Sequence, residues 1–595
     1  LRDYQRACVG HVSARNTLVV LPPNAGKTFI AAEAIAETLD NEEARVVVFL
    51  APTAVLAEQQ YTVLLERLGS QVHGDAALAR RRLLLLKGGG AHGSDDDSRV
   101  ADEAQCLVGT PQLLVLMLTH GRLRMSDIAL LVLDEAHKVA EAANNHPYTV
   151  LMRCFYTRCA ADKRPRVLGL TATPLDSDRH AAREADDEAM HDSAKKGLGE
   201  LAGRLDATLW TARPSESQDA DAARLLEWPS FVSQPLESIA YVASDELDPH
   251  SKLVVEAVGR VAGSIAGEVE GTLWAAWQRK WKDLCTLLEK IARELGARSC
   301  DRAARLLLDQ LKLTHEQRRG RRTSFEPDRQ IEEALAAAAT RNVQLKARLR
   351  ATALAALERE LSRVDETSQP EAGASWKVEA LRRKLEEWER STGGQKAIVF
   401  MRERVACRLL GEELGCEWIV ADGGGRGGGA SSTFGLVRQT AEDHHRALAR
   451  FRSDACRVLV ATQVLAEGID VPECQLVVGF DAPDTSRELT QWRGRARAAE
   501  PRYLHMAANG DGGAHIERLR RLAEATHRAA AAWDLGSAPA SFDWPTSDAI
   551  VETETGATMP EEEAKSYLHS RVYEMSFGDG EIDLSEKHFS ERNNF

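Results

Sequence analysis

The sequence lacks long hydrophobic runs. Among its 595 residues there is no stretch of about 18 apolar residues, and the N-terminus does not have the basic, apolar and small-residue sections of a signal peptide. We therefore expect an intracellular protein, cytoplasmic or nuclear, that has no contact with a membrane. Because the sequence starts at Leu1, directly on a motif, we also expect it to be a piece of a longer chain.

Paired cysteines and an excess of positive charge are also missing. The ten cysteines contain no C-x-x-C pair, so we expect reduced thiols and no structural zinc or disulfide framework. The net charge of -14 argues against a surface coated in positive potential. Nucleic-acid binding can still occur in a groove lined by backbone amides and a few arginines, so it has to be argued from motifs.

What the sequence does contain is two sets of short apolar runs. The length predicts three or four domains, and 44% hydrophobic with 28% charged residues is typical of soluble globular proteins. Each run is followed by turn residues and a segment of helix length, which indicates buried parallel strands in α/β sheets. The first set is NTLVVL, ARVVVFLAP, QCLVGTP, IALLVLDEAH and RVLGLTATP, and the second is KAIVF, CRVLVATQ and CQLVVGFD.

A region without strand signals separates the two sets. From about residue 246 to 372, Ala, Leu, Glu, Arg and Lys recur at helical spacing, which predicts an all-helical insert. Its Trp274, Trp277 and Trp281 share one helical face, for which we favour core packing over a partner surface. The glycine-rich stretches 87–98 and 422–432 have no hydrophobic period and are predicted to be surface loops.

A phosphate-binding loop is indicated at LPPNAGKTFIA, residues 21–31. Lys27 and Thr28 follow a predicted strand and precede a predicted helix, which is the context that such a loop requires. Backbone N–H groups at the helix start would hold phosphates, Lys27 would add charge, and Thr28 would ligate Mg²⁺. Asn24 stands where glycine is usual, but asparagine tolerates left-handed backbone better than most residues. By itself, this stretch fits a plain strand-turn-helix equally well.

Two further motifs favour the nucleotide reading. In LLVLDEAHK, residues 130–138, a strand ends in adjacent carboxylates: Asp134 suits a metal ligand, and Glu135 suits a base that orients water for attack on the γ-phosphate. In LTQWRGRARA, residues 489–498, arginines on the second α/β domain could neutralise charge on a transferred phosphate. An isolated arginine-rich loop would be read as a solvated surface.

In this order the motifs resemble those of superfamily 2 helicases with two RecA-like domains. LRDYQ (1–5) resembles the Q motif, APTAVLAEQQ (51–60) motif Ia, VGTP (108–111) motif Ib and LTATP (170–174) motif III. AIVFMRE (397–403) resembles motif IV, VATQVLAEGIDVPEC (460–474) motif V, and the arginine stretch motif VI. The implied fold class is α/β: two tandem RecA-like domains with parallel sheets, an all-helical insert between them and a helical C-terminal extension.

Several stretches resemble the group of Dicer helicases and RIG-I-like receptors more narrowly. These are NNHPYTVLMRCFY (144–156), the helical insert and RGRAR, while segments at 201–212, 293–311 and 551–572 are similar to Dicer. The implied domains are RecA-like domain 1 (1–228), the helical insert with flanking linkers (229–374), RecA-like domain 2 (375–510), a helical connector (511–548) and the truncated start of a Dicer dimerisation-like domain (549–595). No PAZ-like segment or ribonuclease III acidic signature occurs before Phe595, so we expect that this chain does not itself cleave RNA.

The resemblance implies an ATP-dependent, Mg²⁺-dependent RNA helicase or translocase that grips double-stranded RNA, whose A-form groove hides its base edges. The resemblance is also compatible with a partner protein that binds double-stranded RNA. The implied catalytic residues are Lys27, Glu135, Gln491, Arg495 and Arg497. The implied cofactor-binding residues are Gln5 at the adenine, Asn24, Ala25, Gly26, Lys27, Thr28, Asp134, Gly468 and Asp470, with Thr28 and Asp134 at the metal. The implied nucleic-acid contacts are Pro52, Thr53, Gly109, Thr110 and Thr462, and the implied coupling residues are Thr171, Thr173 and His137, with Glu467 and Gly468 linking motif V to ATP.

The pattern also has departures, and it leaves other functions open. Asn24 and Ala25 replace the commoner Gly-Ser, and Gln463 and Ala466 stand where this group often has Ser or Asp and an acidic residue. An archaeal Hef-type DNA translocase shares the helical insert, and stimulation by branched DNA would favour it. An RNA sensor with weak ATP turnover is the third hypothesis.

Overall fold

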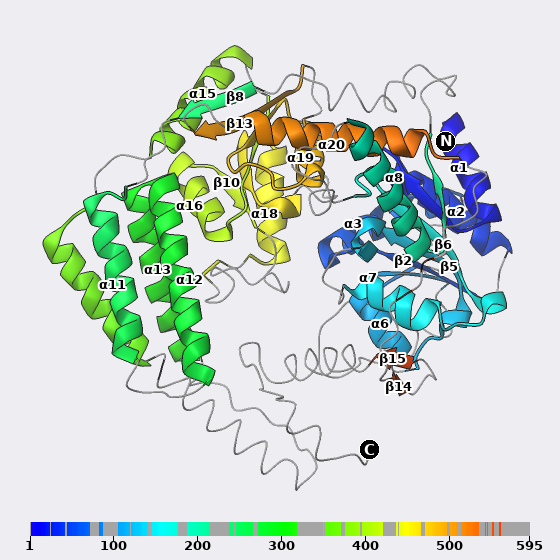
Figure 1. Cartoon of the computed structure of the whole chain (residues 1–595), viewed down its shortest axis with the longest axis horizontal. Helices are drawn as coiled ribbons and strands as arrows, with labels where there is room; N and C mark the ends of the chain where they lie inside the picture. Colours follow the sequence, from blue (N-terminus) through cyan, green and yellow to red (C-terminus); the bar gives the residue numbers. More distant parts are fainter. Residues whose placement is uncertain are drawn as a thin grey trace, which may run out of the picture. The chain divides into compact units, whose positions relative to one another are not determined.

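The protein, seen here in a computed structural model, divides into two compact units (Figure 1). Unit 1 comprises Leu1–Ser233, Thr485–Thr490 and Leu519–Phe595, and unit 2 comprises Gln234–Asp484 and Gln491–Arg518. The structure describes residues 2–560 apart from 24, 42–44, 72–82, 87–104, 120, 141–145, 176–186, 213–236, 242–245, 266–271, 318–348, 350, 371–374, 393–394, 421–435, 438, 466–470, 497–499, 509–512, 535–541, 543, 545–549 and 553–557.

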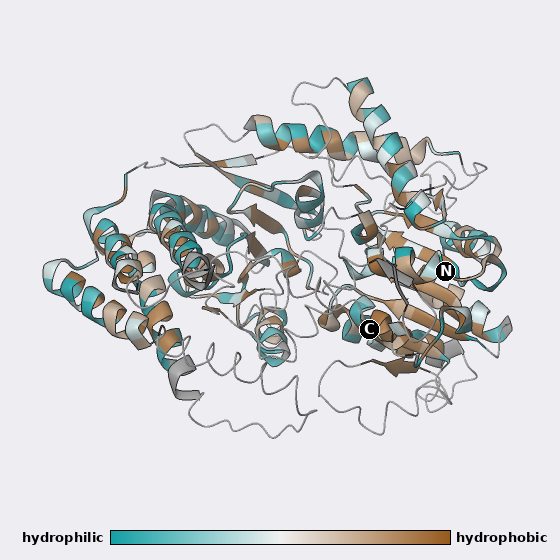
Figure 2. Ribbon diagram, turned by 60° about the horizontal axis from the view of Figure 1, so that its bottom comes forward, coloured by the Kyte–Doolittle hydropathy of each residue, from teal (hydrophilic) through white to brown (hydrophobic). Residues whose placement is uncertain are grey.

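Unit 1 is built on a parallel seven-stranded sheet in the order β3-β4-β2-β5-β6-β1-β7. The predicted runs form its central strands, and their side chains are almost entirely buried because helices cover both faces. Figure 2 shows these strands mostly in the brown of hydrophobic residues. The strands are β1 (Thr17–Val20), β2 (Val46–Leu50), β3 (Leu83–Leu85), β4 (Cys106–Gly109), β5 (Ile128–Asp134), β6 (Arg166–Thr171) and β7 (Thr208–Trp210).

The helices of unit 1 alternate with these strands. Its core combines the sheet with α6, α7, α8 and the helical turn η3, and it also takes in Ala529 and Ala530 of α20. The helices and turns are α1 (Asp3–Ala14), α2 (Lys27–Asn41), α3 (Ala54–Gln71), α6 (Pro111–Thr119), η1 (Met125–Asp127), η2 (Ala136–Ala140), α7 (Pro147–Val150), η3 (Leu151–Tyr156), η4 (Ala161–Lys163) and α8 (Asp187–Arg204), with α20 (Gly513–Ala531) divided between the two units.

The predicted helical connector is α20, and its second part packs on unit 1. The guanidinium of Arg521 donates two hydrogen bonds, of 3.0 and 2.7 Å, to one carboxylate oxygen of Asp187 at the start of α8. Beyond the helix, Trp533 packs against the core of unit 1, and the Arg204 guanidinium lies 4.4 Å from the ring centroid of Phe542. A short antiparallel pair follows, β14 (Ile550–Glu552) with β15 (Thr558–Pro560).

Unit 2 contains a second parallel sheet, in the order β10-β11-β9-β12-β13-β8. Three of its strands are the predicted runs, whereas β8, β10 and β13 were not predicted. β8 comes from the linker expected to flank the insert. The strands are β8 (Glu237–Tyr241), β9 (Ala397–Phe400), β10 (Glu417–Ile419), β11 (Val458–Ala461), β12 (Leu476–Gly479) and β13 (Arg502–Ala508).

The helices of the predicted insert share one hydrophobic core with this sheet. Buried residues of α11, α12 and α13 form a continuous cluster with residues 349–364, α15, α16 and the strands. Trp281 is 1% exposed within it, as expected for core packing, whereas the side chains of Trp274 and Trp277 lie outside the described residues. The helices and the turn of unit 2 are α11 (Pro249–Ile265), α12 (Thr272–Leu295), α13 (Ala297–Gln317), α15 (Trp376–Thr392), α16 (Arg404–Leu414), α18 (Ala441–Arg452) and η7 (Gln463–Leu465), with α19 (Ser486–Arg493) divided between the two units.

Two parallel α/β sheets joined through a helical segment confirm the predicted fold class of tandem RecA-like domains with a helical insert and a helical extension. The exact domain boundaries remain predictions. The glycine-rich stretches 87–98 and 422–432 and most of residues 549–595 lie outside the described residues.

The shared core of unit 2 can be tested by truncating one buried side chain in the insert. Leu288 of α12 is 1% exposed, so we expect Leu288→Ala to lower the free energy of unfolding by about 2–5 kcal/mol. Because the core is continuous, hydrogen exchange should accelerate in peptides of β9 and β11 as well as in the insert. Leu131→Ala in β5 of unit 1 is the matched control. Faster exchange confined to the insert helices would show that the insert has a core of its own.

Candidate active site

The phosphate loop lies between β1 and α2, as predicted, and α2 already includes Lys27 and Thr28. The loop is fixed at its start by a hydrogen bond from the Leu21 N–H to the Thr171 carbonyl, 3.2 Å. Gly26 has a φ of +78°, and a Cβ atom there would lie 2.3 Å from Nε2 of Gln5. Glycine is therefore required both by the backbone and by the close approach of Gln5. Asn24 lies outside the described residues.

Lys27 and Thr28 form the first turn of α2, and the N-terminus of a helix is favourable for binding an anion. The Lys27 ammonium donates to the carbonyls of Leu21 and Pro22, at 3.2 and 3.1 Å, so its side chain folds back over the loop. Thr28 is half-buried beside it. The arrangement places one positive charge and one hydroxyl at a helix N-terminus.

Helix α1 presses two side chains against this loop. The Gln5 amide donates to the Ala25 carbonyl at 3.1 Å, and its oxygen accepts from the Arg2 N–H at 2.9 Å. The Tyr4 hydroxyl donates to the same Ala25 carbonyl at 2.7 Å. Gln5 therefore positions the phosphate loop, while its predicted contact with adenine remains a prediction. Tyr4 was missed, because nothing in its sequence position marks it as a neighbour of the loop.

Asp134 and Glu135 stand at the end of β5. Asp134 accepts hydrogen bonds from the Glu135 N–H at 3.1 Å and from the Gln60 amide at 3.2 Å. Burial raises the pKa of the Asp134 carboxyl, and the nearby Lys27 ammonium acts against that rise. The structure thus brings the phosphate loop and the DEAH residues together, as predicted. Gln60 of α3 was not identified from the sequence as a partner of Asp134.

Glu135 has a backbone conformation that non-glycine residues seldom adopt. Its φ is +49°, which costs on the order of 1 kcal/mol for a residue with a Cβ. Its carboxylate lies 3.4 Å from Nδ1 of His137. Strained residues of this kind concentrate at functional sites, where the surrounding structure holds them in place.

The three predicted coupling residues form one buried contact. Nδ1 of His137 lies 3.0 Å from the Thr171 hydroxyl, which also accepts from the Thr173 N–H at 3.2 Å. Burial lowers the pKa of His137 well below its ordinary value, and the positive charge of Arg487 acts in the same direction. A neutral imidazole therefore joins the end of β5 to the end of β6.

The residues available here fit a nucleotide carrying Mg²⁺. A desolvated carboxyl with a raised pKa, beside a single ammonium, gains stability from a divalent cation at the same place. Thr28 and Asp134 would hold the metal, and the first turn of α2 with Lys27 would hold phosphate oxygens.

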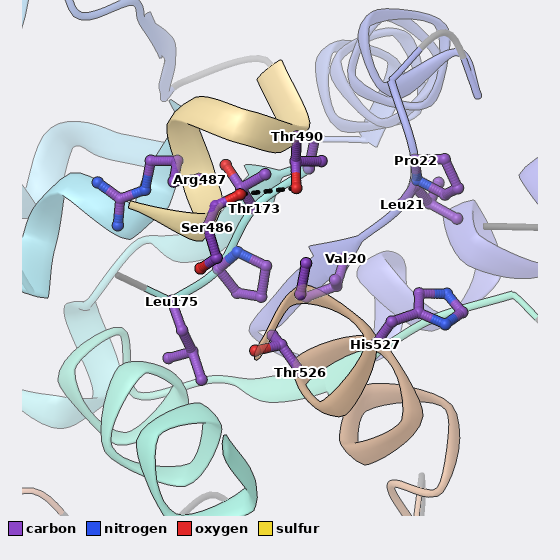
Figure 3. A pocket seen from close by; sticks show the side chains of 13 residues that line it. Val20, Leu21, Pro22, Thr173, Leu175, Ser486, Arg487, Thr490, Thr526 and His527 are labelled. Carbon is purple, nitrogen blue, oxygen red and sulfur yellow. Dashed lines mark hydrogen bonds between the residues drawn. The ribbon is translucent and has the colours of Figure 1, made fainter. Parts of the chain in front are cut away.

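A small cavity of about 30 Å³ adjoins the phosphate loop (Figure 3). It is lined by Leu21 and Pro22, by the loop after β6, by Arg487 and Thr490 of α19, and by α20. Burial lowers the pKa of His527 on α20 to about 4, so this imidazole is neutral at pH 7. A volume of this size accommodates one or two water molecules. Its lining shows that α20 and the first part of α19 pack directly beside the phosphate loop, which the sequence did not predict.

The predicted nucleic-acid residues of unit 1 lie side by side at the same edge of the sheet. β2 and β4 pair so that Leu50 stands opposite Gly109, and Pro52, Thr53 and Thr110 follow these strand ends. The structure therefore brings these residues together, and their contact with nucleic acid stays a prediction.

Motifs V and VI meet inside unit 2. The Gln463 amide donates to the Gln491 side-chain oxygen at 2.5 Å, and the Trp492 indole N–H donates to the Gln463 oxygen at 2.6 Å. Thr462 and Arg495 are buried, at 4% and 5% exposure. Arg497, Glu467, Gly468 and Asp470 lie outside the described residues. The catalytic roles proposed for the arginines remain predictions.

The described residues contain neither a metal-binding cluster nor a membrane-spanning helix. No group of three His, Cys, Asp or Glu side chains there is arranged to hold a metal ion. None of the described helices combines the length and apolar character needed to span a bilayer. All ten cysteines are free thiols.

Comparison with known proteins agrees with this site. The DEAD/DEAH box helicase family model matches residues 2–180, and the helicase conserved C-terminal domain model matches residues 376–499. The first match contains the phosphate loop and Asp134–Glu135, and the second contains motifs IV to VI. Helicase domains of this family bind ATP, so the matches agree with the geometry of the loop.

The chain is similar over most of its length to curated Dicer-like proteins. Dicer-like protein 1 of Cryphonectria parasitica is 26% identical over 528 residues, 86% of this chain and 30% of that protein. Dicer-like protein 1 of Neurospora crassa is 26% identical, with 87% and 30% covered, and that of Neosartorya fischeri is 28% identical, with 88% and 31% covered. The chain thus spans about 30% of the length of these relatives.

Among solved structures, the helicase domain of Hef from Pyrococcus furiosus is similar to this chain, with 20% sequence identity. The alignment covers 86% of this chain and 96% of that one, with a TM-score of 0.41. The chain therefore carries a DEAD/DEAH box helicase domain followed by a helicase conserved C-terminal domain, and over most of its length it is similar to Dicer-like proteins.

Proposed function

We propose that this chain is an ATP hydrolase stimulated by double-stranded RNA, and that it forms the helicase region of a Dicer-like endoribonuclease. The observation that carries the proposal is the convergence of Lys27, Asp134 and Glu135 at one edge of the first sheet. The similarity to Dicer-like proteins supports RNA as the nucleic acid.

In this proposal each residue of unit 1 has a separate task. Lys27 and the first turn of α2 bind the terminal phosphates, and Thr28 and Asp134 hold Mg²⁺. When bound, Mg²⁺ supplies positive charge to the β- and γ-phosphate oxygens. Glu135 orients the attacking water, and His137, Thr171 and Thr173 link that step to the rest of the domain.

Residues of unit 2 are assigned further roles from their motifs. Arg495 and Arg497 are assigned the neutralisation of charge on the transferred phosphate, and Gln491 is held in position by Gln463. Pro52, Thr53, Gly109, Thr110 and Thr462 are assigned to the phosphodiester backbone, because A-form RNA is recognised through its shape and 2'-hydroxyls.

Removing the water-orienting carboxylate should stop turnover without unfolding the chain. We expect Glu135→Gln to lower kcat for ATP hydrolysis by at least about a hundredfold, the scale of a lost general base. Lys27→Ala should weaken nucleotide binding as well as turnover, because it removes the ammonium that faces the phosphates. Steady-state phosphate release and nucleotide titration measure the two effects.

Lys196→Ala and Glu188→Gln, on the exposed face of α8, are matched controls and should behave as the parent does. Near-parental turnover in Glu135→Gln would remove Glu135 from its assigned role.

The nucleic-acid preference can be decided by one comparison at fixed salt, since phosphate contacts depend strongly on ionic strength. We expect double-stranded RNA to stimulate ATP hydrolysis at least about tenfold more, in activity per bound complex, than single-stranded RNA or duplex DNA, a difference of roughly 1.4 kcal/mol. Stronger stimulation by branched DNA than by duplex RNA would favour a DNA translocase. Tight duplex RNA binding without stimulation, unchanged in Lys27→Ala, would favour an RNA sensor.

A further inference from the structure

Tyr148 is a buried side chain in a segment to which the proposed function assigns no role. It belongs to α7, which begins at Pro147 and is capped by His146, whose Nδ1 accepts the Tyr148 N–H at 3.2 Å. The next residue, Thr149, donates its hydroxyl to the Val139 carbonyl at 3.0 Å. Tyr148 is 0% exposed, so its ring is fixed inside unit 1.

The Tyr148 hydroxyl lies between the ends of two strands, and the loops that follow these strands have different proposed roles. It is 2.9 Å from the carbonyl of Leu50, the last residue of β2, and 2.8 Å from the carbonyl of Asp134, the last residue of β5. β2 and β5 are neighbours in the sheet, with Leu50 paired to Leu133. β2 leads into Pro52 and Thr53, whereas β5 leads into Glu135. One side chain thus touches the origins of both loops.

The chemistry of a phenol gives this contact two states. A hydroxyl has a single proton, so it makes one full hydrogen bond to either carbonyl or a weaker shared bond to both. The two distances differ by only 0.1 Å, and a small shift of either strand end changes which carbonyl receives the proton. Burial and the carboxylates of Asp134 and Glu135 raise the pKa of Tyr148 well above its ordinary value, so the hydroxyl remains a donor.

We propose that Tyr148 is a positioning residue that couples the nucleic-acid loop after β2 to the hydrolytic residues after β5, through the choice of carbonyl that its hydroxyl serves. The proposal rests on the proposed function for the identity of the two loops. Coupling of this kind requires a two-state element on which both sites act, and in this proposal the shared hydroxyl is that element. Tyr148 itself contacts neither ATP nor RNA in this role.

Tyr156, the last residue of η3 and eight positions after Tyr148, provides a matched control. It is 1% exposed in the same core, and its hydroxyl contacts Asn16 at 2.8 Å and Asp206 at 3.0 Å, neither of which belongs to the loops after β2 and β5. Tyr148→Phe and Tyr156→Phe each remove one buried hydroxyl from unit 1. A purely structural role for Tyr148 predicts that the two variants lose thermal stability and nothing more.

The first measurement is the ratio of ATP turnover with saturating duplex RNA to turnover without nucleic acid, in the full chain. We expect Tyr148→Phe to lower this ratio by about fivefold or more, the lower end of ordinary coupling between sites. Tyr156→Phe should keep the parental ratio. A parental ratio in Tyr148→Phe, with the parent itself stimulated by RNA, would overturn the inference and leave the proposed function standing.

The second measurement needs no RNA, so it separates the inference from the proposed function. A non-hydrolysable ATP analogue with Mg²⁺ should slow hydrogen exchange at residues 134–140 in all three proteins. In the parent and in Tyr156→Phe it should also slow exchange at residues 51–57, and in Tyr148→Phe that second response should disappear. Equal protection of 51–57 in parent and Tyr148→Phe would overturn the inference, even where RNA stimulates none of the proteins.

A third protein covers the case in which Tyr148→Phe does not fold. Site-specific 3-fluorotyrosine at position 148 keeps the ring and hydroxyl but makes the hydroxyl a stronger donor. The ATP analogue with Mg²⁺ should change hydrogen exchange at residues 51–57 by a different amount in this protein than in the parent. An identical change in the two proteins would count against the proposal.

Discussion

The site depends on one constraint, the parallel direction of the strands in the first sheet. Because the strands run the same way, their carboxyl ends meet at one edge, and the loops that follow them are brought together. The phosphate loop follows β1, Glu135 follows β5, Thr173 follows β6, and Pro52 follows β2. Residues more than a hundred positions apart in sequence therefore converge without any direct pairing between their loops.

Charge balance at that edge depends on burial. Burial alone favours a neutral Asp134 carboxyl, and the Lys27 ammonium, the Glu135 N–H and the Gln60 amide all act to keep it charged. These groups come from α2, from the residue that follows β5 and from α3. The charge state of the Asp134 carboxyl therefore depends on the packing of all three segments. Disorder in any of them would change how readily the carboxylate binds a cation.

Much of the fold could be predicted because strands buried on both faces appear as continuous apolar runs. β1, β2, β4, β5 and β6 were identified in this way, as were β9, β11 and β12. The strands that were missed are short, such as β3, β7 and β10, or contain polar residues, such as β13 with Arg502 and His505. Short strands at sheet edges are defined by their partner and not by their own residues, so a pattern search does not find them.

Residues of the site could be predicted only where a sequence motif by itself indicates their chemical role. Lys27, Asp134 and Glu135 belong to such motifs. Gln60 and Tyr148 do not, because a glutamine in a helix and a tyrosine after a proline acquire their roles from tertiary contacts.

Gln463 shows how a departure from a family pattern can be accommodated by its surroundings. Serine or aspartate at this position would be too short to reach both Gln491 and the Trp492 indole in the way that the longer amide does. Trp492 is fully buried and stacks on Phe400, with ring centroids 5.2 Å apart, so its N–H needs an acceptor inside unit 2. Gln463 supplies that acceptor and at the same time fixes the orientation of Gln491. The departure is therefore compatible with an ordered motif VI, since the same side chain satisfies a buried donor and positions a residue assigned to catalysis.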